Sequence, residues 1–452
     1  MEWTAETVRR KQKELLFPNV STYYQDALVV DSAKGMFVRD VDGREYLDFF
    51  AGILTVSVGH CHPRVTQAAI EQQKKLVHVS TLYSTVPQVQ LAKKLVHVST
   101  LYSTVPQVQL AEKLVQIGPM KPAKAFFSNS GTEANDTAVT LAKEATGRTE
   151  LVVLRHNYGG RGTLALSTMG VKQYRPRVQS EISGIRFAHA PYCYRCDLDL
   201  KYPDCGVACA KDLKPLIETT THGEIAAFMA ETIMGVGGFI VPPKEYFQIA
   251  LPIVKAAGGL FIADEVQTAW GRTGGKWWGI EQFGVEPDIL TSAKGMANGQ
   301  PIGLTLARSE IAEHARFAQI STFGGSPVSM AASLATIGVI EEEKLLFNSQ
   351  MMGQALREGL EGFKERFPGI GDVRGMGLMQ AIELVKDRGT KEPDPQAASR
   401  LLEATRNRGL LVGKGGTYGN ALRIAPPMVV TRGQVDDALR ILGEALAEAL
   451  RR

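Results

Sequence analysis

The sequence predicts an α/β fold in which a mostly parallel sheet is covered by helices. The first observation is a set of short apolar runs that end in small or polar residues, as buried strands do. They read AKAFFSNSG, ELVVLRH, EIAAFMAE, GLFIADEV, PDILTSAKG and PIGLTLARS. The second is the amphipathic segments between several of them, such as TEANDTAVTLAKEATG and PKEYFQIALPIVKAAGG. Alternation of this kind is typical of a parallel sheet, whose ligands gather at the carboxyl ends of the strands.

Length, composition and charge indicate a globular protein. The chain has 452 residues, of which 44% are hydrophobic, so it can bury a large core in two or three domains. The formal net charge is only +4 and both signs are interspersed, which indicates no surface for nucleic acid or for a membrane. The N-terminal segment MEWTAETVRRKQKELLF is charged throughout, and no run reaches the roughly 20 apolar residues of a membrane helix. We therefore expect a cytoplasmic protein.

One nineteen-residue phrase, KKLVHVSTLYSTVPQVQLA, occurs twice in succession, at 74–92 and at 93–111. Stacked repeat proteins need about three or more copies and let the copies diverge, whereas these two are identical. We interpret the phrase as a recent tandem duplication in an older fold. Within one copy, STLYST predicts a loop, and Pro106 begins a predicted helix that ends at Gly118.

The first predicted strand leads into FFSNSGTEAND, which precedes a helix that we expect to begin at Glu133. Ser130 and Thr132 supply hydroxyl groups, and Gly131 lets the backbone approach a ligand closely. With the free N–H groups of a helix N-terminus, these residues could bind a phosphate. The alternative is an ordinary helix N-cap beside a flexible glycine.

Charged residues stand at the ends of two other strands. Asp264 and Glu265 end the apolar run GLFIADEV, where a buried carboxylate needs a positive partner. That partner is either a structural salt bridge or, for Asp264, a protonated heteroaromatic nitrogen. Lys294 follows PDILTSAKG among small residues, and it is either solvated or a lysine whose lowered pKa suits Schiff-base chemistry. Together the three features match the phosphate, ring nitrogen and aldehyde of pyridoxal phosphate.

These segments and several others are similar, in sequence and in order, to the class III (ω-amino acid) pyridoxal-phosphate aminotransferases of fold type I. The resemblance covers nearly the whole chain and rests on YLDFFAGILTVSVGHCHPRV, SNSGTEAND, DEVQTAWGRTG, AKGMANGQPIG, STFGGSPVSMAA, VRGMGLMQAIEL and LRIAPPM. It implies a large cofactor-binding domain at 65–330, a small α+β domain at 331–452, and an N-terminal segment at 1–64 that joins the small domain and the interface. It also implies a homodimer or a dimer of dimers, because the family's active sites lie at the dimer interface.

The resemblance implies roles for the residues around the cofactor ring. Lys294 would form the Schiff base and then move a proton between substrate and cofactor. Asp264 would keep the ring nitrogen protonated. Tyr158 and Val266 would lie on the two faces of the ring, and Gln267 near the ring oxygen.

Other roles concern the phosphate and the substrate. Gly131 and Thr132 would hold the phosphate together with Thr322 from the partner subunit. Arg423, in LRIAPPM, would pair bidentately with the substrate carboxylate. The loop's aromatic residue, Tyr102 in the second copy of the doubled phrase, would contact substrate in the neighbouring active site. We expect the second copy to be functional because the helix after it must pack under the cofactor strand.

Three positions depart from the family pattern. An aromatic-His-Gly run becomes Tyr158-Gly159-Gly160, and the usual Glu-Pro becomes Glu231-Thr232, which keeps an acid that is expected at the cofactor. Third, Val236 stands where 4-aminobutyrate and ornithine aminotransferases carry a glutamate that neutralises the carboxylate-binding arginine. Without that glutamate, the arginine should stay available for a carboxylate.

The motif ETIMGVGG around Val236 is similar to the alanine–glyoxylate aminotransferase 2 branch. We therefore expect a transaminase that moves an amino group from a small amino acid (alanine, or a β- or ω-amino acid) to a 2-oxo acid such as pyruvate or glyoxylate. The alternatives are a 4-aminobutyrate or ornithine type that uses 2-oxoglutarate, a decarboxylase or aminomutase, and a silent binding protein on the same scaffold. Lys294 argues against the silent protein, and Arg423 favours amino acids over simple amines.

One segment, PYCYRCDLDLKYPDCGVACAKD, lies outside the family pattern. Its cysteines Cys193, Cys196, Cys205 and Cys209 have the spacing C-x2-C-x8-C-x3-C. They are either four reduced thiols, which we favour, or the ligands of a tetrahedral zinc ion. The sequence leaves both alternatives open.

Overall fold

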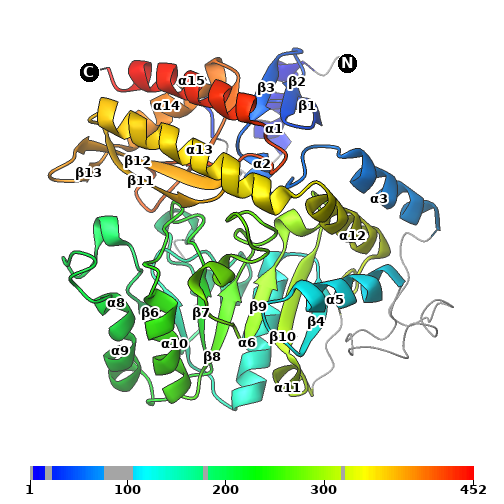
Figure 1. Cartoon of the computed structure of the whole chain (residues 1–452), viewed down its shortest axis with the longest axis vertical. Helices are drawn as coiled ribbons and strands as arrows, with labels where there is room; N and C mark the ends of the chain where they lie inside the picture. The colour runs from blue at the N-terminus through cyan, green and yellow to red at the C-terminus, as the bar shows by residue number, and fades with distance from the viewer. Residues whose placement is uncertain (1–3, 16–22, 76–104, 177–181, 317–320, 452) are drawn as a thin grey trace.

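The computed structural model describes residues 4–15, 23–75, 105–176, 182–316 and 321–451. These residues form three sheets with helices packed around them (Figure 1). Seven strands build the largest sheet, in the spatial order β4, β10, β9, β8, β7, β5 and β6. Their bounds are Ala123–Ser128 (β4), Leu151–Leu154 (β5), Ile185–Ala188 (β6), Ala227–Glu231 (β7), Leu260–Asp264 (β8), Ile289–Ser292 (β9) and Gly303–Arg308 (β10).

The large sheet is mostly parallel, as predicted, with one reversed strand. Strand β5 pairs in parallel with β6 and with β7, β7 pairs in parallel with β8, and β8 pairs in parallel with β9. Strand β10, the predicted run PIGLTLARS, is antiparallel to both β4 and β9. The reason is the short chain between Ser292 and Gly303, because a parallel crossover needs about a dozen residues or more. Strand β6 was not among the runs that the sequence analysis singled out.

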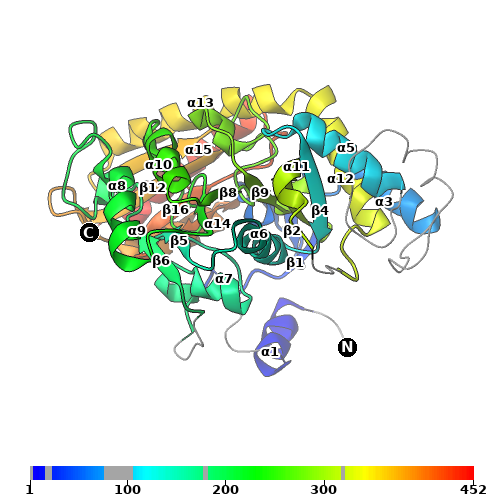
Figure 2. The same ribbon diagram turned by 90° about the horizontal axis from the view of Figure 1, so that it is seen from below.

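Helices cover both faces of the large sheet. Figure 2 shows α6 (Gly131–Thr146) and α7 (Thr163–Ser167) on one side, and α5 (Val105–Ile117) and α10 (Tyr246–Ala256) on the other. Side chains alternate between the two layers, as the strand period of two requires. In β5, for example, Val152 and Leu154 join one core cluster, whereas Leu151 and Val153 join the cluster beneath α6. Burial on both faces explains why the strands are apolar along their whole length.

The two smaller sheets bring the two ends of the chain together. One contains β11 (Ile370–Met376), β12 (Met379–Asp387), β16 (Ala421–Ile424) and β15 (Gly413–Gly415), with β13 (Glu392–Pro393) beside β12. The other contains β1 (Val30–Lys34), β2 (Phe37–Asp40), β3 (Glu45–Asp48) and β14 (Leu410–Leu411). Because β14 pairs in parallel with β3, residues near the N-terminus share a sheet with residues near the C-terminus. The domain limits 1–64, 65–330 and 331–452 stay predictions.

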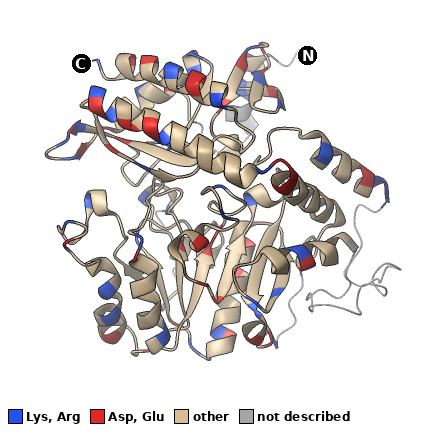
Figure 3. Cartoon of the chain, in the orientation of Figure 1, with Lys and Arg blue, Asp and Glu red and all other residues tan. Residues whose placement is uncertain are grey.

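The remaining helices lie around these sheets. They are α1 (Ala5–Leu15), α2 (Ala51–Leu54), α3 (Pro63–Lys75), α8 (Ala208–Lys211), α9 (Leu213–Thr220), α11 (Ser309–Ala312), α12 (Pro327–Glu342), α13 (Leu345–Arg366), α14 (Pro395–Asn407) and α15 (Arg432–Ala449). Figure 3 shows both signs of charge mixed along their outer faces, for example on α13 and α15. Among the described residues, no helix combines the length and the apolar composition that a bilayer crossing requires.

The doubled phrase lies partly outside the described residues, which omit 76–104. Its first two residues end α3, and the PQVQLA of its second copy belongs to α5. Helix α5 packs on β4, with Leu110 and Ala111 fully buried. The helix expected from Pro106 to Gly118 is therefore present as α5, and residues 106–111 of the second copy belong to the helix that packs on β4.

Candidate active site

A cavity of about 130 Å³ opens at the carboxyl ends of the parallel strands. This is where ligands of such sheets bind. Its lining comes from the residues that follow β5, β7, β8 and β9 and from the first turns of α6. These residues are Gly131, Thr132, Asn135, Tyr158, Gly159, Gly160, Glu231, Asp264, Val266, Gln267, Ala293 and Lys294.

Most of the predicted site residues meet at this cavity, and four predicted residues, Ser130, Thr322, Tyr102 and Arg423, are not among its lining residues. Ser130 lies one position before the lining, at the start of α6. Thr322 is exposed and does not line the cavity, so its predicted place in a partner's site stays a prediction. Tyr102 lies outside the described residues.

The N-terminus of α6 forms one end of the cavity. The helix begins at Gly131, two residues before the predicted start, because Ser130 is its N-cap and its side chain accepts a 3.3 Å hydrogen bond from the N–H of Glu133. At Gly131 any Cβ would lie 2.9 Å from a methyl group of Val266, so only glycine fits. Unpaired N–H groups at a helix start attract an anion.

Asp264 is buried at the end of β8 and is oriented by Asn135. The amide nitrogen of Asn135 donates to Asp264 Oδ2 at 2.8 Å and to the carbonyl oxygen of Gly159 at 2.9 Å, and its oxygen accepts from Thr291 at 2.6 Å. Burial raises the pKa of Asp264, whereas the bonds from Asn135 and from the N–H of Val266, with the nearby Lys294, lower it. No salt bridge to Asp264 forms within the described residues, so the structural alternative from the sequence receives no support.

Glu265, the next residue, is fully buried and faces another set of donors. Its carboxylate accepts bonds from the hydroxyl groups of Thr232 and Thr268, each at 2.6 Å, and from the N–H groups of Gly279 and Ile280 at 2.8 and 2.7 Å. Four donors compensate for the loss of water around this charge. The two neighbouring acids therefore differ: Asp264 lines the cavity, and Glu265 ties two loops together.

Glu231 is the second acid of the cavity, and it holds backbone on one side of it. It accepts bonds from the N–H of Tyr158 at 2.8 Å and the N–H of Gly235 at 2.7 Å. Burial raises the pKa of Glu231, and the nearby Asp264 raises it further. The bond from the N–H of Tyr158 fixes the backbone of that residue, which lines the cavity.

Lys294 follows β9 and begins a short turn with φ +40°, a strained conformation for a residue other than glycine. Such strain persists where surrounding structure enforces it, and functional sites are the usual places. Burial lowers the pKa of Lys294, the carboxylates of Asp264 and Glu231 raise it, and Arg423 lowers it. Lys294 therefore lies within electrostatic reach of both acids and of the predicted carboxylate-binding arginine.

Arg423 lies on β16 and is only 1% exposed. Its guanidinium contacts the faces of two rings, with its central carbon 5.1 Å from the centroid of Phe50 and 5.5 Å from that of Phe239. Its hydrogen bonds go to neutral oxygens, and among the described residues no carboxylate pairs with it. A buried cation without an anion is costly, so this position suits an anionic ligand.

Sequence reasoning missed two residues of the site. Asn135 lies one helical turn after Gly131, so the spacing i, i+4 on the predicted helix could have placed it in the cavity. No sequence pattern points to Tyr23. It belongs to the N-terminal segment, and its hydroxyl contacts Arg423, which lies 400 residues later in the sequence.

The cavity residues fit pyridoxal phosphate. They provide a helix N-terminus for the phosphate, a buried acid for the ring nitrogen and a lysine for the aldehyde. In addition, Gln267 Oε1 is buried without a hydrogen-bond partner among the described residues, which leaves it for a ligand. The fold and these residues define a pyridoxal-phosphate enzyme of fold type I.

The family follows from comparison with known proteins. The model of aminotransferase class III matches residues 20–446, and the chain belongs to that family. It is 40% identical over 434 residues to alanine–glyoxylate aminotransferase 2 homolog 2, mitochondrial, of Arabidopsis thaliana, covering 96% of this chain and 86% of the relative. A leucine/methionine racemase of Thermococcus litoralis is 35% identical over 436 residues, 96% of this chain and 94% of the relative.

Solved structures agree. An amine transaminase of an uncultivated Pseudomonas species, described in its PLP-bound form, superposes with a TM-score of 0.86 at 30% identity, covering 96% of this chain and 99% of that one. The protein is therefore a pyridoxal-phosphate-dependent aminotransferase, as the sequence predicts.

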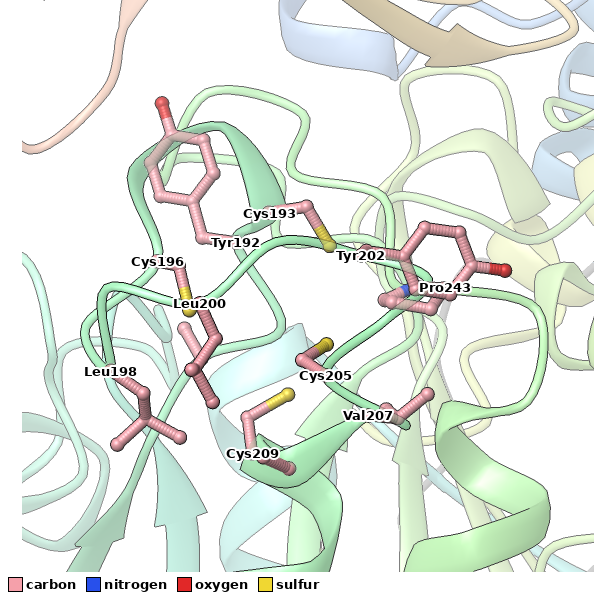
Figure 4. Close-up of a pocket in the computed structure, with 12 residues that line it drawn as sticks. Tyr192, Cys193, Cys196, Leu198, Leu200, Tyr202, Cys205, Val207, Cys209 and Pro243 are labelled. Carbon is pink, nitrogen blue, oxygen red and sulfur yellow. The ribbon is translucent and has the colours of Figure 1, made fainter.

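The four clustered cysteines lie apart from this cavity, around a small pocket of about 20 Å³ (Figure 4). Burial raises the pKa of Cys193 to about 11 and that of Cys209 to about 12, and the neighbouring thiols add to both shifts. Within the described part of the chain, no three His, Cys, Asp or Glu side chains are arranged to hold a metal ion. Both alternatives from the sequence, four reduced thiols and a zinc site, stay predictions.

Proposed function

We propose that this aminotransferase transfers an amino group from a small amino acid, such as alanine or a small β-amino acid, to pyruvate or glyoxylate. The observation that carries the proposal is the environment of Arg423, which is buried and has only neutral oxygens as partners. Val236, which replaces the glutamate of the 4-aminobutyrate and ornithine enzymes, lies in an apolar cluster with Met169 and Val171. Within the described part of the chain, no carboxylate then competes with a substrate carboxylate for this cation.

The cofactor would be held by residues on three sides of the cavity. Gly131 and Thr132, after the Ser130 cap, would bind the phosphate, with Thr322 of the partner subunit as a further contact. Tyr158 and Val266 would enclose the ring, and Gln267 would lie near the ring oxygen. The support for these roles is that, apart from Ser130 and Thr322, these residues line one cavity.

Proton transfer would depend on Lys294 and the two acids. Bound pyridoxal phosphate supplies an electron sink for the bond that breaks at the substrate α carbon. Asp264, held by Asn135, would keep a proton on the ring nitrogen. Lys294 would take the α proton and deliver it on the cofactor side, a task that suits an amine whose pKa is lowered by burial.

Arg423 would fix the substrate by its carboxylate and so determine which bond faces Lys294. A planar guanidinium can form two parallel hydrogen bonds to a carboxylate, which lysine cannot. We further propose that Tyr102 contributes to the substrate pocket, that the enzyme is a homodimer or a dimer of dimers, and that it is cytoplasmic. Light scattering would test the assembly state. Cell fractionation would test the location, since the Arabidopsis relative is described as mitochondrial.

A second candidate keeps the same proton chemistry. The similarity to a leucine/methionine racemase favours it, because racemisation also begins with loss of the α proton. A racemase returns that proton without transferring nitrogen, so the two candidates differ in whether the amino donor is consumed.

Half-reactions test the proposal directly. The loaded enzyme is mixed with alanine, β-alanine or 4-aminobutyrate without acceptor, and the conversion of the cofactor to its amine form is followed by absorbance. We expect conversion with alanine or β-alanine, stoichiometric release of the matching oxo acid, and no conversion in a Lys294→Ala variant. Conversion with 4-aminobutyrate alone would overturn the assignment, and inversion of L-alanine without conversion would favour the racemase.

A further inference from the structure

The hydrogen bonds of Arg423 show that its site is partly covered by Tyr23. A guanidinium has five N–H donors, and the two nitrogen pairs that can bind a carboxylate bidentately both include Nη2. Both hydrogens of Nη2 are engaged: one is donated to the hydroxyl of Tyr23 at 3.0 Å and the other to the carbonyl oxygen of Lys414 at 2.9 Å. Bidentate binding of a carboxylate therefore requires one of these two bonds to open.

The two acceptors differ in how easily they can leave. The carbonyl oxygen of Lys414 belongs to β15, which is paired with the strand of Arg423 itself. Tyr23 is 38% exposed. Its ring contacts the ring of Phe50 in a tilted arrangement, with the centroids 5.8 Å apart. Among the described residues, moving Tyr23 disturbs the hydrogen bond to Arg423 and the ring contact with Phe50, whereas moving Lys414 disturbs a sheet.

The other donors of Arg423 also meet no carboxylate of the described residues. Nε is buried and has no hydrogen-bond partner among the described residues, and Nη1 makes only a long bond of 3.3 Å to the carbonyl oxygen of Gly235. A carboxylate that replaced the Tyr23 hydroxyl could use Nη2 and one of these under-used donors. It would also bring the negative charge that the phenol lacks.

We propose that Tyr23 is a neutral cover for Arg423 that the substrate carboxylate displaces, and that it thereby sets the affinity for carboxylate substrates. This inference rests on the proposed function, because it takes Arg423 to be the carboxylate site. A neutral phenol satisfies the arginine when no carboxylate is bound, and it competes more weakly than a glutamate would. The cover therefore costs carboxylate substrates some affinity and does not affect amines that lack a carboxylate.

The test is Tyr23→Phe, which keeps the ring contact with Phe50 and removes only the hydroxyl. We expect the KM for alanine and the inhibition constant of propionate, a carboxylate without an amino group, to fall by about three- to tenfold, in line with the loss of one competing hydrogen bond. We expect this change to exceed any change in kcat with alanine and any change in kcat/KM with an aromatic amine donor that lacks a carboxylate.

The matched control is Tyr24→Phe, which removes a hydroxyl one residue further along the same segment. The Tyr24 ring lies over the guanidinium of Arg406, 4.9 Å from the centroid, and not over Arg423. This variant should leave the propionate constant unchanged. An equal effect in both variants would overturn the inference. A weaker affinity for propionate in Tyr23→Phe would also overturn it, because it would show that the hydroxyl itself binds the substrate.

Arg423→Leu separates the two proposals. If propionate binds equally well to Arg423→Leu and to the unchanged enzyme, the carboxylate site lies elsewhere and the proposed function fails with the inference. If Arg423→Leu weakens propionate and Tyr23→Phe has no effect, only the cover is refuted.

Discussion

Asn135 shows how one neutral residue can connect all parts of a charged site. It lies in the first turns of α6, donates to Asp264 and to the backbone of Gly159 next to Tyr158, and accepts from Thr291 on β9, the strand that leads to Lys294. Because both N–H donors and the oxygen of its amide make hydrogen bonds, its orientation is determined by the network. The carboxylate of Asp264 is thereby aimed before any ligand arrives.

We predict that Asn135→Ala changes how the stability of the cofactor-free protein depends on pH. Losing the amide donor raises the pKa of Asp264 further, since burial then acts with less compensation. An acid whose pKa is raised on folding stabilises the folded state below its unfolded pKa, and this contribution is lost as the pH rises through the folded value. Relative to the unchanged protein, the variant should therefore lose more stability when the pH is raised from about 5, just above the unfolded pKa of an aspartate, to about 8.

Urea unfolding of the two cofactor-free proteins at both pH values measures this difference. Thr305→Val is the control, because it removes another buried hydrogen bond to the same helix, from the Thr305 hydroxyl to the carbonyl oxygen of Ala134. It should lower stability equally at both pH values. A pH-independent loss in Asn135→Ala would show that the amide does not act on Asp264.

At the scale of elements, the chain segments after β7 and β8 are joined through Glu265. Thr232, which replaces the family's usual proline, donates its hydroxyl to this buried carboxylate. The departure that the sequence showed therefore has a structural consequence. The rigid turn is lost, and a hydrogen bond between two neighbouring strand ends takes its place.

We predict that Thr232→Val destabilises the protein by about 1 to 3 kcal/mol, because it leaves a buried charge one donor short. The affinity for pyridoxal phosphate should stay nearly unchanged, since Glu265 does not line the cofactor cavity. Thr232→Ser keeps the donor and should recover most of the stability. Equilibrium denaturation and cofactor titration measure the two quantities, and a loss of cofactor affinity at unchanged stability would contradict the separation of the two acids.

Much of the fold and of the site could be predicted at this scale. Apolar strands, helix caps and the residues after strand ends are local signals, so β4, β5, β7, β8, β9 and β10 and the residues that follow several of them were found. The reversed direction of β10 and the small sheets depend on pairing between distant segments, which local periodicity does not carry. Tyr23 was missed for the same reason, because only the folded chain brings it to Arg423.

At the scale of the whole molecule, the doubled phrase is the clearest irregularity. Because the copies are identical, removal of any nineteen-residue window that starts between 74 and 93 yields the same shorter chain. We predict that this chain is at least as stable and as active as the full one, since the copy in α5 is retained. Thermal unfolding and the half-reaction with alanine measure both properties.

A deletion of 105–117, which removes α5 itself, is the contrasting control. It takes away the buried Leu110 and Ala111 under β4, so the large sheet loses part of one cover and folding should fail. A large loss of activity in the chain that lacks one copy would refute the view that this copy is surplus.

The pairing of β3 with β14 also determines the order in which the sheets can fold during synthesis. All seven strands of the large sheet lie between Ala123 and Arg308, so that sheet can form while the ribosome is still translating the rest. The sheet that contains β3 cannot be completed at that stage, because the neighbouring strand β14 is synthesised more than 350 residues later. The hydrogen bond between Tyr23 and Arg423 likewise cannot form until Arg423 has been synthesised. A nascent chain released before that point would carry a nearly finished cofactor cavity and an open strand edge, a state that quality-control proteases and chaperones can recognise.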